Sequence, residues 1–286
     1  MTKILLPFFI LFAMAQHSTA QWSLDQGAGY YKLSAWYLQA DEHYTDTGDI
    51  DPNATRGQFN VNLYAEYGLG HRFDVIAYIP FFARTYQNDI VSGTTGATIT
   101  PGEEVNSIGD IDLAIRYGIV QKENWVLSGS LLFGLPSGES SGGSDGSYQT
   151  GDGEFNQMAR MTLGVPFLIG KLPIYAKTYL GFNNRTQDFS DELRGGIEIG
   201  TQIINGLWIA GKSDSIQSLQ NGSRNATNTA PGSVFANNVE FTSLGVEASY
   251  YLTDTFGVSA NYTGALSGKI IYAAPSYSGG IFLDLK

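Results

Sequence analysis

The feature that most constrains this chain is a strict alternation of apolar and polar side chains between Gln58 and Tyr67. The segment reads Gln-Phe-Asn-Val-Asn-Leu-Tyr-Ala-Glu-Tyr, so its odd-numbered positions are apolar and its even-numbered positions, apart from Tyr64, are polar. Successive side chains of a β-strand point to opposite faces, so a period of two predicts a strand with one apolar and one polar face. About ten residues is also the length that a tilted strand needs to cross a bilayer.

The same pattern recurs along the chain and predicts twelve strands. Their expected ranges are 29–40, 57–68, 72–83, 107–119, 124–135, 154–168, 173–184, 192–204, 207–218, 238–252, 255–265 and 276–286. The connections between them are alternately short and long, as are the periplasmic turns and extracellular loops of outer-membrane barrels. We therefore expect an all-β fold: a transmembrane antiparallel β-barrel of about 12 strands, with both chain ends on the periplasmic side.

The N-terminal segment has the composition of a cleaved signal peptide. Lys3 precedes an apolar run from Ile4 to Ala15, and Ser18 and Ala20 supply the small residues of a cleavage site. The run is too short for a membrane-spanning helix. We expect residues 1–20 to be removed after export and residues 21–286 to form a single barrel domain in the outer membrane of a Gram-negative bacterium.

Composition argues against several functional classes and partners. The chain has no cysteine, which excludes disulfide bonds and thiol-ligated metals. Its formal net charge of -11 argues against nucleic acid as a partner. The partners that we expect are outer-membrane lipid and a small-molecule solute, without a cofactor. The sequence leaves the oligomeric state open.

Separating the two faces of each strand places a set of charged side chains inside the barrel. The pore-lining candidates are Glu66, Asp110, Asp112, Arg116, Arg160, Lys177, Arg194, Glu198, Lys212, Asp214, Glu240 and Glu247, and the same parity adds Asp74. Glu247 has the opposite parity to Glu240, and a β-bulge near Ser243 and Leu244 would return it to the lumen.

Two interpretations of these inward charges remain open. They could line a water-filled, mildly cation-favouring passage and select what enters it. They could instead pair with one another and hold a closed lumen together. Twelve strands lie between the small barrels that side chains fill and the wide barrels that leave an aqueous channel, so size alone does not decide.

The histidines do not support an enzyme. Outside the predicted signal peptide the chain has only His43, in the expected first outer loop, and His71, in the first short turn. A histidine base needs a nucleophile and a third group that orients it, and the sequence places no such set beside either residue. We therefore expect no enzymatic activity.

One loop has the spacing of a calcium site. Asp49, Asp51 and Asn53 follow a D-x-D-x-N pattern, and Asp46 could add a fourth oxygen ligand. The glycine and the glutamate that an EF-hand loop needs further along are absent. This leaves a weak calcium candidate, and the alternative is a set of turn-forming acids on a solvated loop.

Three segments resemble a known family. They are Ser107–Tyr117, with a Gly-Asp-hydrophobic start, Phe133–Glu139, with Gly-Leu-Pro-Ser-Gly, and Gln149–Asn156, with Thr-Gly-Asp-Gly. In this order they resemble the outer-membrane proteins of the meta-pathway phenol-degradation family, which is distantly similar to FadL-type channels. Asp110, Asp112 and Arg116 fall on the strand of that pattern. The chain has no obvious N-terminal plug of the FadL type and no aromatic residue at its C-terminus.

The resemblance implies a barrel that passes aromatic or other poorly soluble molecules. Our leading hypothesis is therefore passive or facilitated passage of small molecules, including aromatic or hydrophobic ones, across the outer membrane. Tyr86, Tyr148 and Phe235 are the candidate first-contact aromatics on the long outer loops. The alternative is a closed structural or surface-interaction barrel whose long acidic outer loops bind a partner.

Overall fold

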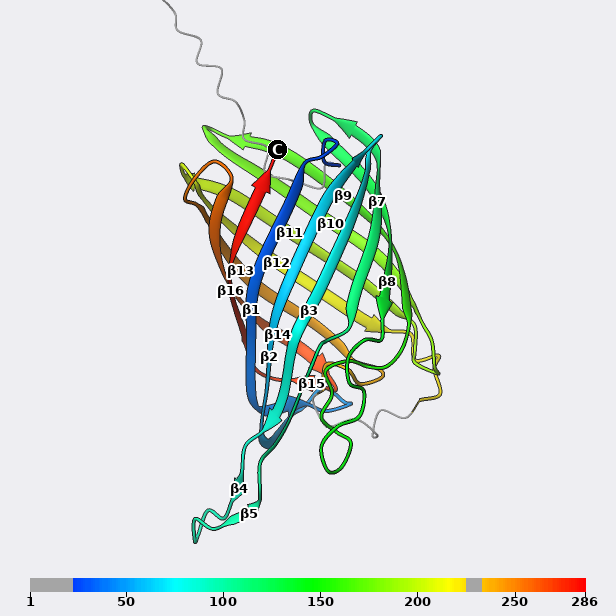
Figure 1. Cartoon of the computed structure of the whole chain (residues 1–286), viewed down its shortest axis with the longest axis vertical. Helices are drawn as coiled ribbons and strands as arrows, with labels where there is room; N and C mark the ends of the chain where they lie inside the picture. Colours follow the sequence, from blue (N-terminus) through cyan, green and yellow to red (C-terminus); the bar gives the residue numbers. More distant parts are fainter. Residues whose placement is uncertain (1–22, 225–232) are drawn as a thin grey trace, which may run out of the picture.

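The computed structural model describes residues 23–224 and 233–286, so the predicted signal peptide lies outside the described residues. Twelve long strands form a closed antiparallel barrel (Figure 1). These strands are β1 (Gly29–Tyr44), β2 (Ile50–Gly70), β3 (Phe73–Gln87), β7 (Ile111–Lys122), β8 (Trp125–Leu135), β9 (Asn156–Ile169), β10 (Leu172–Arg185), β11 (Glu192–Ile204), β12 (Leu207–Ser218), β13 (Glu240–Tyr251), β14 (Phe256–Lys269) and β16 (Ser276–Leu285). In the described part of the chain there is no helix long and apolar enough to span a membrane.

The first and last strands close the barrel. β1 pairs with β2 on one side and with β16 on the other, in a register that runs from Gly29 opposite Leu285 to Leu38 opposite Ser276. The chain also forms four short strands, of which two pair with the wall and two pair with each other. They are β4 (Ile90–Val91), β5 (Thr98–Thr100), β6 (Glu103–Ser107), which pairs with β3, and β15 (Ile271–Tyr272), which pairs with β1.

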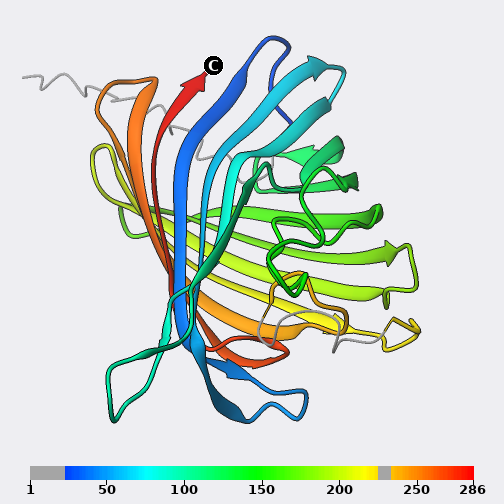
Figure 2. The same cartoon turned by 60° about the horizontal axis from the view of Figure 1, so that its bottom comes forward.

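The two ends of the barrel differ in their connections. One end carries the short turns and the C-terminus, and we call it the turn end (Figure 1). The opposite end carries the long connections, and we call it the loop end. The β4–β5 hairpin projects away from the barrel at the loop end (Figures 1 and 2). This is the alternation of connection lengths that the sequence predicts.

The wall has an apolar outer face and a polar inner face. On β7, Leu113, Ile115 and Tyr117 are 42%, 51% and 40% exposed, whereas the intervening Ala114 and Arg116 are buried. Exposed apolar side chains recur in this way on every long strand except β12, where serine and glycine occupy much of the outer face. Such a surface is stable in contact with lipid, since contiguous apolar patches of this size are rare on water-soluble proteins.

The ends of several strands differ from the sequence prediction. The expected loop over 41–56 is mostly strand, because β1 continues to Tyr44 and β2 begins at Ile50. His43 therefore lies in β1, paired with Asp51, and not in an outer loop. Glu154, expected in a strand, precedes β9 and belongs to the long connection before it. The alternating pattern weakens where strands leave the lipid, so it marks the spanning part better than the extensions.

The bulge that the sequence predicts in β13 lies instead in the neighbouring strand β14. The register between β13 and β14 shifts between Thr242 and Ser243. Thr242 pairs with Ser267 and Ser243 with Ala265, so the extra residue is Leu266 of β14, whereas β13 pairs with β12 without a shift. Leu244 and Val246 are exposed on the outer face, so the intervening positions face inward, and Glu247 contacts Lys32 and Lys212 inside the barrel.

Candidate functional site

The middle of the lumen holds a chain of alternating charges that we call the waist ladder: Lys32, Glu247, Lys212, Glu198 and Lys177. The Lys32 Nζ lies 2.9 Å from Glu247 Oε1, and the Lys177 Nζ lies 3.0 Å from Glu198 Oε2. Lys212 joins the two halves, because its Nζ pairs with Glu247 and also lies 3.6 Å from Glu198 Oε2. Three lysines face two glutamates, so the ladder has an excess of one positive charge.

The ladder bridges the interior of the barrel. Lys32 belongs to β1 and Glu247 to β13, and β16 and β14 lie between these two strands in the sheet. The intervening strands carry small side chains at Ser259 and at its pairing partner Gly280. These small residues leave room for the ion pair between Lys32 and Glu247 to pass over the wall. The ladder therefore narrows the lumen at the waist.

Two cavities adjoin the waist ladder and share Lys177, Glu198 and Lys212 in their linings. The larger has a volume of about 410 Å³, and aromatic side chains form much of its wall. They are Tyr30, Tyr64, Tyr78, Tyr175, Trp208, Tyr251 and Phe282. The smaller, of about 210 Å³, is lined by charged and hydroxyl groups and by Ile197. The interior thus contains space for small molecules, bordered by aromatic rings on one side and by charges on the other.

A first arginine centre, which we call the Arg116 cluster, connects three neighbouring strands. The Arg116 Nε donates to Asp74 Oδ2 at 2.8 Å, and its Nη2 donates to Glu66 Oε2 at 2.7 Å. The Tyr64 hydroxyl also donates to Glu66, and the Leu24 backbone N–H donates to Asp74 Oδ1 at 2.8 Å. Arg116 is 2% exposed and Asp74 is fully buried. The cluster is a satisfied buried network within the wall.

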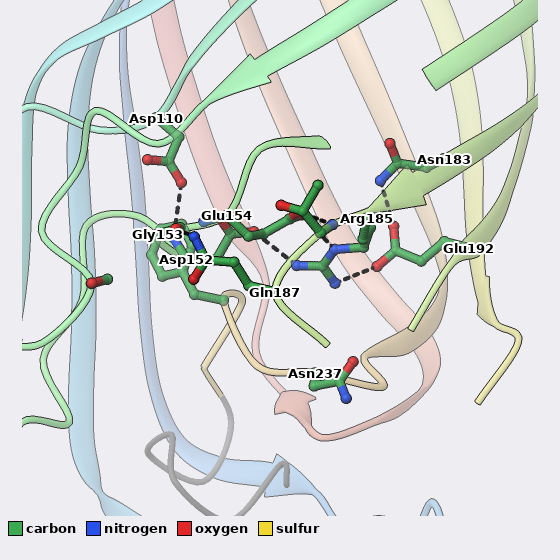
Figure 3. Close-up of polar contacts among 12 residues, drawn as sticks. Asp110, Asp152, Gly153, Glu154, Asn183, Arg185, Gln187, Glu192 and Asn237 are labelled. Atoms are coloured by element: carbon green, nitrogen blue, oxygen red, sulfur yellow. Dashed lines mark hydrogen bonds and ion pairs between the residues drawn. The ribbon is translucent and has the colours of Figure 1, made fainter. Parts of the chain in front are cut away.

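A second arginine centre, which we call the Arg185 cluster, joins a strand to a long loop (Figure 3). The Arg185 guanidinium donates to Asp152 Oδ2 at 2.8 Å, to Glu154 Oε1 at 2.7 Å and to Glu192 Oε1 at 2.9 Å. Glu192 begins β11, whereas Asp152 and Glu154 lie in the connection between β8 and β9. Arg194 also binds Glu192, with its Nη2 2.6 Å from Oε2. Arg185 therefore ties this connection to the barrel wall.

Asp110 holds the same connection from the opposite side. Its carboxylate accepts hydrogen bonds from the Gly138 N–H at 2.9 Å and from the Asp152 N–H at 2.8 Å. The approach requires glycine at position 151, since a Cβ there would collide with the Asp110 carboxylate. Asp110 thus lies beside the loop, before β7, and not on a pore-lining strand as the sequence suggested.

Burial changes the acidity of these loop carboxyl groups. Desolvation raises the pKa of Asp152 to about 6, although the neighbouring Arg185 partly opposes the shift. Desolvation also raises the pKa of Asp110 and of Glu154 above their ordinary values, against the hydrogen bonds that each accepts. Each of the three carboxyl groups therefore takes up a proton at a higher pH than an exposed carboxyl group would.

The long connections form a structure at the loop end that we call the loop cap, made of residues 136–155, 186–191 and 233–239 (Figure 2). Its segments bind one another and the wall: the Ser190 N–H donates to Asn237 Oδ1 at 2.8 Å, and the Thr85 hydroxyl donates to the Gln149 carbonyl at 2.6 Å. Ser190 and Asn237 are almost fully buried. The loop cap is therefore a folded element of the barrel mouth.

The aromatic residues predicted on the outer loops have different positions in the structure. Tyr148 is buried in the loop cap, with the Arg56 guanidinium 5.1 Å from its ring centroid, so it is not the exposed first-contact residue that was expected. Tyr86 lies in β3, where its hydroxyl is 3.2 Å from that of Tyr37 on the outer face. Phe235 lies in the loop cap and is partly buried.

Most of the predicted inward charges face the interior and have partners there. Beyond the ladder and the two arginine clusters, Glu240 pairs with Lys269 at 3.0 Å, and Asp214 accepts from the Tyr179 hydroxyl at 2.8 Å. Asp112 interacts electrostatically with Arg194 and Arg160, which lie on other strands.

Sequence reasoning missed Lys32, Arg185 and Asp152 as site residues. Lys32 has the same parity as Tyr30 and Ser34, which is a signal that could have placed it in the lumen. Arg185 and Asp152 lie at or beyond the ends of alternating segments, where parity gives no direction. Only the folded connection brings these two residues together.

The calcium candidate has no support from the geometry. Asp46 and Asp49 lie in the turn between β1 and β2, whereas Asp51 and Asn53 lie in β2 itself. The Asp49 carboxylate accepts a hydrogen bond from the Thr47 hydroxyl at 2.9 Å, as a turn-forming acid does. Within residues 23–224 and 233–286, no group of three or more histidines, cysteines or acids could hold a metal ion.

Comparisons with known proteins show the fold. No family model matches the sequence, and no curated protein matches it. The COG4313 outer membrane channel from Pseudomonas putida F1 is 14% identical, with a TM-score of 0.56 over 92% of this chain and 97% of that chain. The NanC porin is 10% identical, with a TM-score of 0.50 over 91% and 99% of the two chains. The translocator domain of the autotransporter NalP from Neisseria meningitidis is 12% identical, with a TM-score of 0.50 over 92% and 90%.

This chain has the fold of outer-membrane β-barrels. At such low identity the likeness extends to the fold alone. The resemblance to the phenol-degradation and FadL-type families stays a prediction, as does the absence of enzymatic activity.

Proposed function

We propose that this barrel is an outer-membrane channel for small molecules, with its turn end in the periplasm and its loop end at the cell surface. The observation that carries the proposal is the pair of adjoining cavities inside a wall whose outer face suits lipid. Lys177, Glu198 and Lys212 of the waist ladder line both cavities. A passing solute can therefore form hydrogen bonds with them. The loop cap covers part of the outer mouth, so we expect it to restrict entry to the lumen.

The lining of the larger cavity supports aromatic or partly apolar solutes. Tyr30, Tyr175, Trp208 and Phe282 present rings to the same space, and aromatic pairs gain energy beyond their buried area. The proposal therefore includes small aromatic molecules among the solutes, in agreement with the family resemblance. A comparison of phenol with cyclohexanol tests the preference for aromatic solutes. The two molecules have a similar size and one hydroxyl group each, but only phenol has a π-system.

Single-channel conductance of the refolded protein in a planar bilayer tests the proposal. We expect discrete currents in potassium chloride, together with swelling of liposomes in small solutes. Phenol should reduce the current at lower concentrations than cyclohexanol does. Absence of both current and swelling would refute a channel, and equal block by the two alcohols would refute the aromatic preference.

A second candidate, a closed barrel that binds a partner at its surface, has a specific observation in its favour. The β4–β5 hairpin projects from the loop end and exposes Ile90, Val91 and Ile99, the last at 67%. Exposed apolar residues on a protruding loop are typical of interaction sites. Deletion of residues 90–100 should then abolish partner capture and leave any permeability unchanged. A deletion that alters permeability but not partner capture would refute this candidate.

A further inference from the structure

Arg160 is an inward-facing cation whose charge is not neutralised by an ion pair. Of the arginines that strands place inside the barrel, Arg116, Arg185 and Arg194 bind carboxylates within 3 Å. Arg56 and Arg160 have no ion pair in the described part of the chain. Arg56 is buried beneath the loop cap against Gln87 and Tyr148, whereas Arg160 lines the smaller cavity.

The Arg160 side chain is held in one orientation by neutral neighbours. Its guanidinium carbon lies 5.4 Å from the centroid of the Tyr179 ring, and its Nε donates to the Ser130 hydroxyl at 3.4 Å. These contacts leave the terminal nitrogens without a hydrogen bond among the described residues. The guanidinium offers two parallel N–H groups that match the two oxygens of a carboxylate. Because its orientation is already fixed, less side-chain entropy is lost when the carboxylate binds.

The cavity around Arg160 has the charge for an anion. It is lined by Arg160, Lys177 and Lys212 against Glu198 and Asp214. Lys212 also contacts Glu247, and Asp112 interacts electrostatically with Arg160, so of the three cations only Arg160 lacks an ion pair among the described residues. The two acids are already engaged: Glu198 lies within 4 Å of both lysines, and Asp214 accepts from the Tyr179 hydroxyl. An entering anion therefore meets, in Arg160, a cation that has no ion pair among the described residues.

The other lining groups define what else the ligand needs. Thr162 adds a hydroxyl donor, and Tyr179 adds an aromatic ring to the wall. The volume of about 210 Å³ suits a molecule of a few heavy atoms, and the adjoining aromatic cavity can receive a larger apolar part. A small carboxylate with an apolar tail can bind Arg160 through its oxygens and place its tail in the adjoining aromatic cavity.

We propose that the cavity between Arg160, Lys177 and Lys212 is a binding site for the carboxylate of a small monoanionic solute, with Arg160 as its bidentate ligand. The site lies beside the waist ladder, so a solute that passes the waist meets it. Its role in selection rests on the proposed channel function, whereas its ability to bind does not. The proposal also predicts that the waist favours anions, although acids outnumber bases among the inward candidates of the sequence.

Binding is tested with propionate and its uncharged isostere propionamide. Refolded protein in detergent micelles is titrated calorimetrically with sodium propionate, and sodium chloride keeps the ionic strength constant. We expect saturable binding of propionate and none of propionamide. Arg160→Gln should weaken propionate binding about tenfold or more, because a charge-assisted bidentate contact is lost, and Arg160→Lys should restore part of it.

The matched control is Lys171→Gln, which removes the same charge from an exposed turn between β9 and β10. It should bind propionate as the wild type does. Three results would overturn the site. They are equal propionate affinity in wild type and Arg160→Gln, binding of propionamide by the wild type as tight as that of propionate, and the absence of saturable propionate binding by the wild type. If Arg160→Gln does not refold, the comparison of wild type with Arg160→Lys and with propionamide still decides.

Flux measurements separate the site from the channel. In bilayers with a propionate–chloride gradient, Arg160→Gln should shift the reversal potential toward cation preference, and Lys171→Gln should not. Wild-type protein that binds propionate but carries no current supports the site and refutes the channel. Currents whose selectivity is the same in wild type and Arg160→Gln leave the channel intact and overturn the role of Arg160 in selection.

Discussion

Arg116 and Arg185 use the same chemistry in two regions of the lumen, but they hold different parts of the molecule together. Arg116 of β7 pairs with Asp74 on the adjacent strand β3 and with Glu66 on β2, the next strand beyond it. Arg185 pairs with Glu192 on a neighbouring strand and with two carboxylates of the loop cap. The first centre joins wall to wall, and the second joins wall to loop.

The two clusters differ in whether their ion pairs can open without unfolding of the protein. The strands around Arg116 are fixed by the backbone ladders of a closed barrel, so its carboxylates stay buried whatever happens to the arginine. The loop cap is held by side-chain contacts and a few backbone hydrogen bonds. If Arg185 is lost, its loop partners can move toward water and recover their hydration. We therefore expect the Arg116 cluster to govern stability and the Arg185 cluster to govern access to the lumen.

Arg116→Met is expected to have the largest effect on stability. It leaves Asp74 and Glu66 as uncompensated carboxylates in a dry network, a change that typically costs about 3–5 kcal/mol. Urea unfolding of the refolded barrel in lipid vesicles measures the loss. The double variant with Asp74→Asn should recover part of it, because one of the two stranded charges is removed. A decrease in the free energy of unfolding of less than about 1 kcal/mol would show that the cluster does not stabilise the barrel as a buried ion-pair network.

Arg185→Met is expected to destabilise the barrel less, by about 1–2 kcal/mol, because the loop carboxylates can return to solvent. Its main effect should be on conductance, which we expect to rise severalfold as the loop cap loosens. Planar-bilayer recordings measure this, with Arg84→Gln on the outer face as the charge-matched control. Unchanged conductance together with a large loss of stability would make the two arginine centres equivalent and so contradict the comparison.

Acidification should tighten the loop cap. Burial raises the pKa of Asp152 to about 6, well above the ordinary pKa of an aspartate, so between these two values the folded cap binds a proton that the unfolded chain does not. The linked stabilisation is fully present below about pH 4 and is lost as the pH rises through about 6. Asp110 and Glu154, with pKa values also raised, act in the same direction. We expect channel opening to decrease between pH 7 and pH 5, by an amount equivalent to about 1–3 kcal/mol.

Asp152→Asn supplies the control for this pH dependence. The amide keeps the shape of the carboxyl group but cannot titrate, so recordings at pH 7 should resemble wild type at pH 5. The slope of open probability between these pH values should flatten. A wild-type channel that opens further on acidification would show that loss of the ion pair with Arg185 outweighs burial.

The smallest effect is expected at an exposed ion pair on the outer face. The side chains of Arg84 and Glu104 are 43% and 47% exposed, although they form a direct contact. Pairs of this exposure contribute about 0–0.5 kcal/mol, since water and salt screen the charges. Arg84→Gln should shift the urea midpoint little if at all. A shift as large as that of Arg116→Met would mean that burial is not what separates these ion pairs.

The wall of the barrel could be derived from the sequence because alternation is a local property. In the segment from Gln58 to Tyr67, each side chain takes its face from its own position in an extended strand, without reference to any partner. The same rule placed Arg116, Lys177 and Glu198 inside. The rule does not apply to Tyr148 and Glu154, which lie in long connections where no period constrains the backbone. There, burial is decided by contacts with segments far away in the chain.

A two-faced β-barrel with charges inside follows from the sequence alone, because the face of each residue follows from a repeat of two. Only the tertiary structure decided which charges meet. Lys32 and Glu247 are far apart in sequence and touch because closure of the barrel brings β1 near β13. Arg185 is neutralised and Arg160 is left without an ion pair because a distant loop folds against one arginine and not the other. Pairing depends on distances across the lumen, which no local pattern encodes.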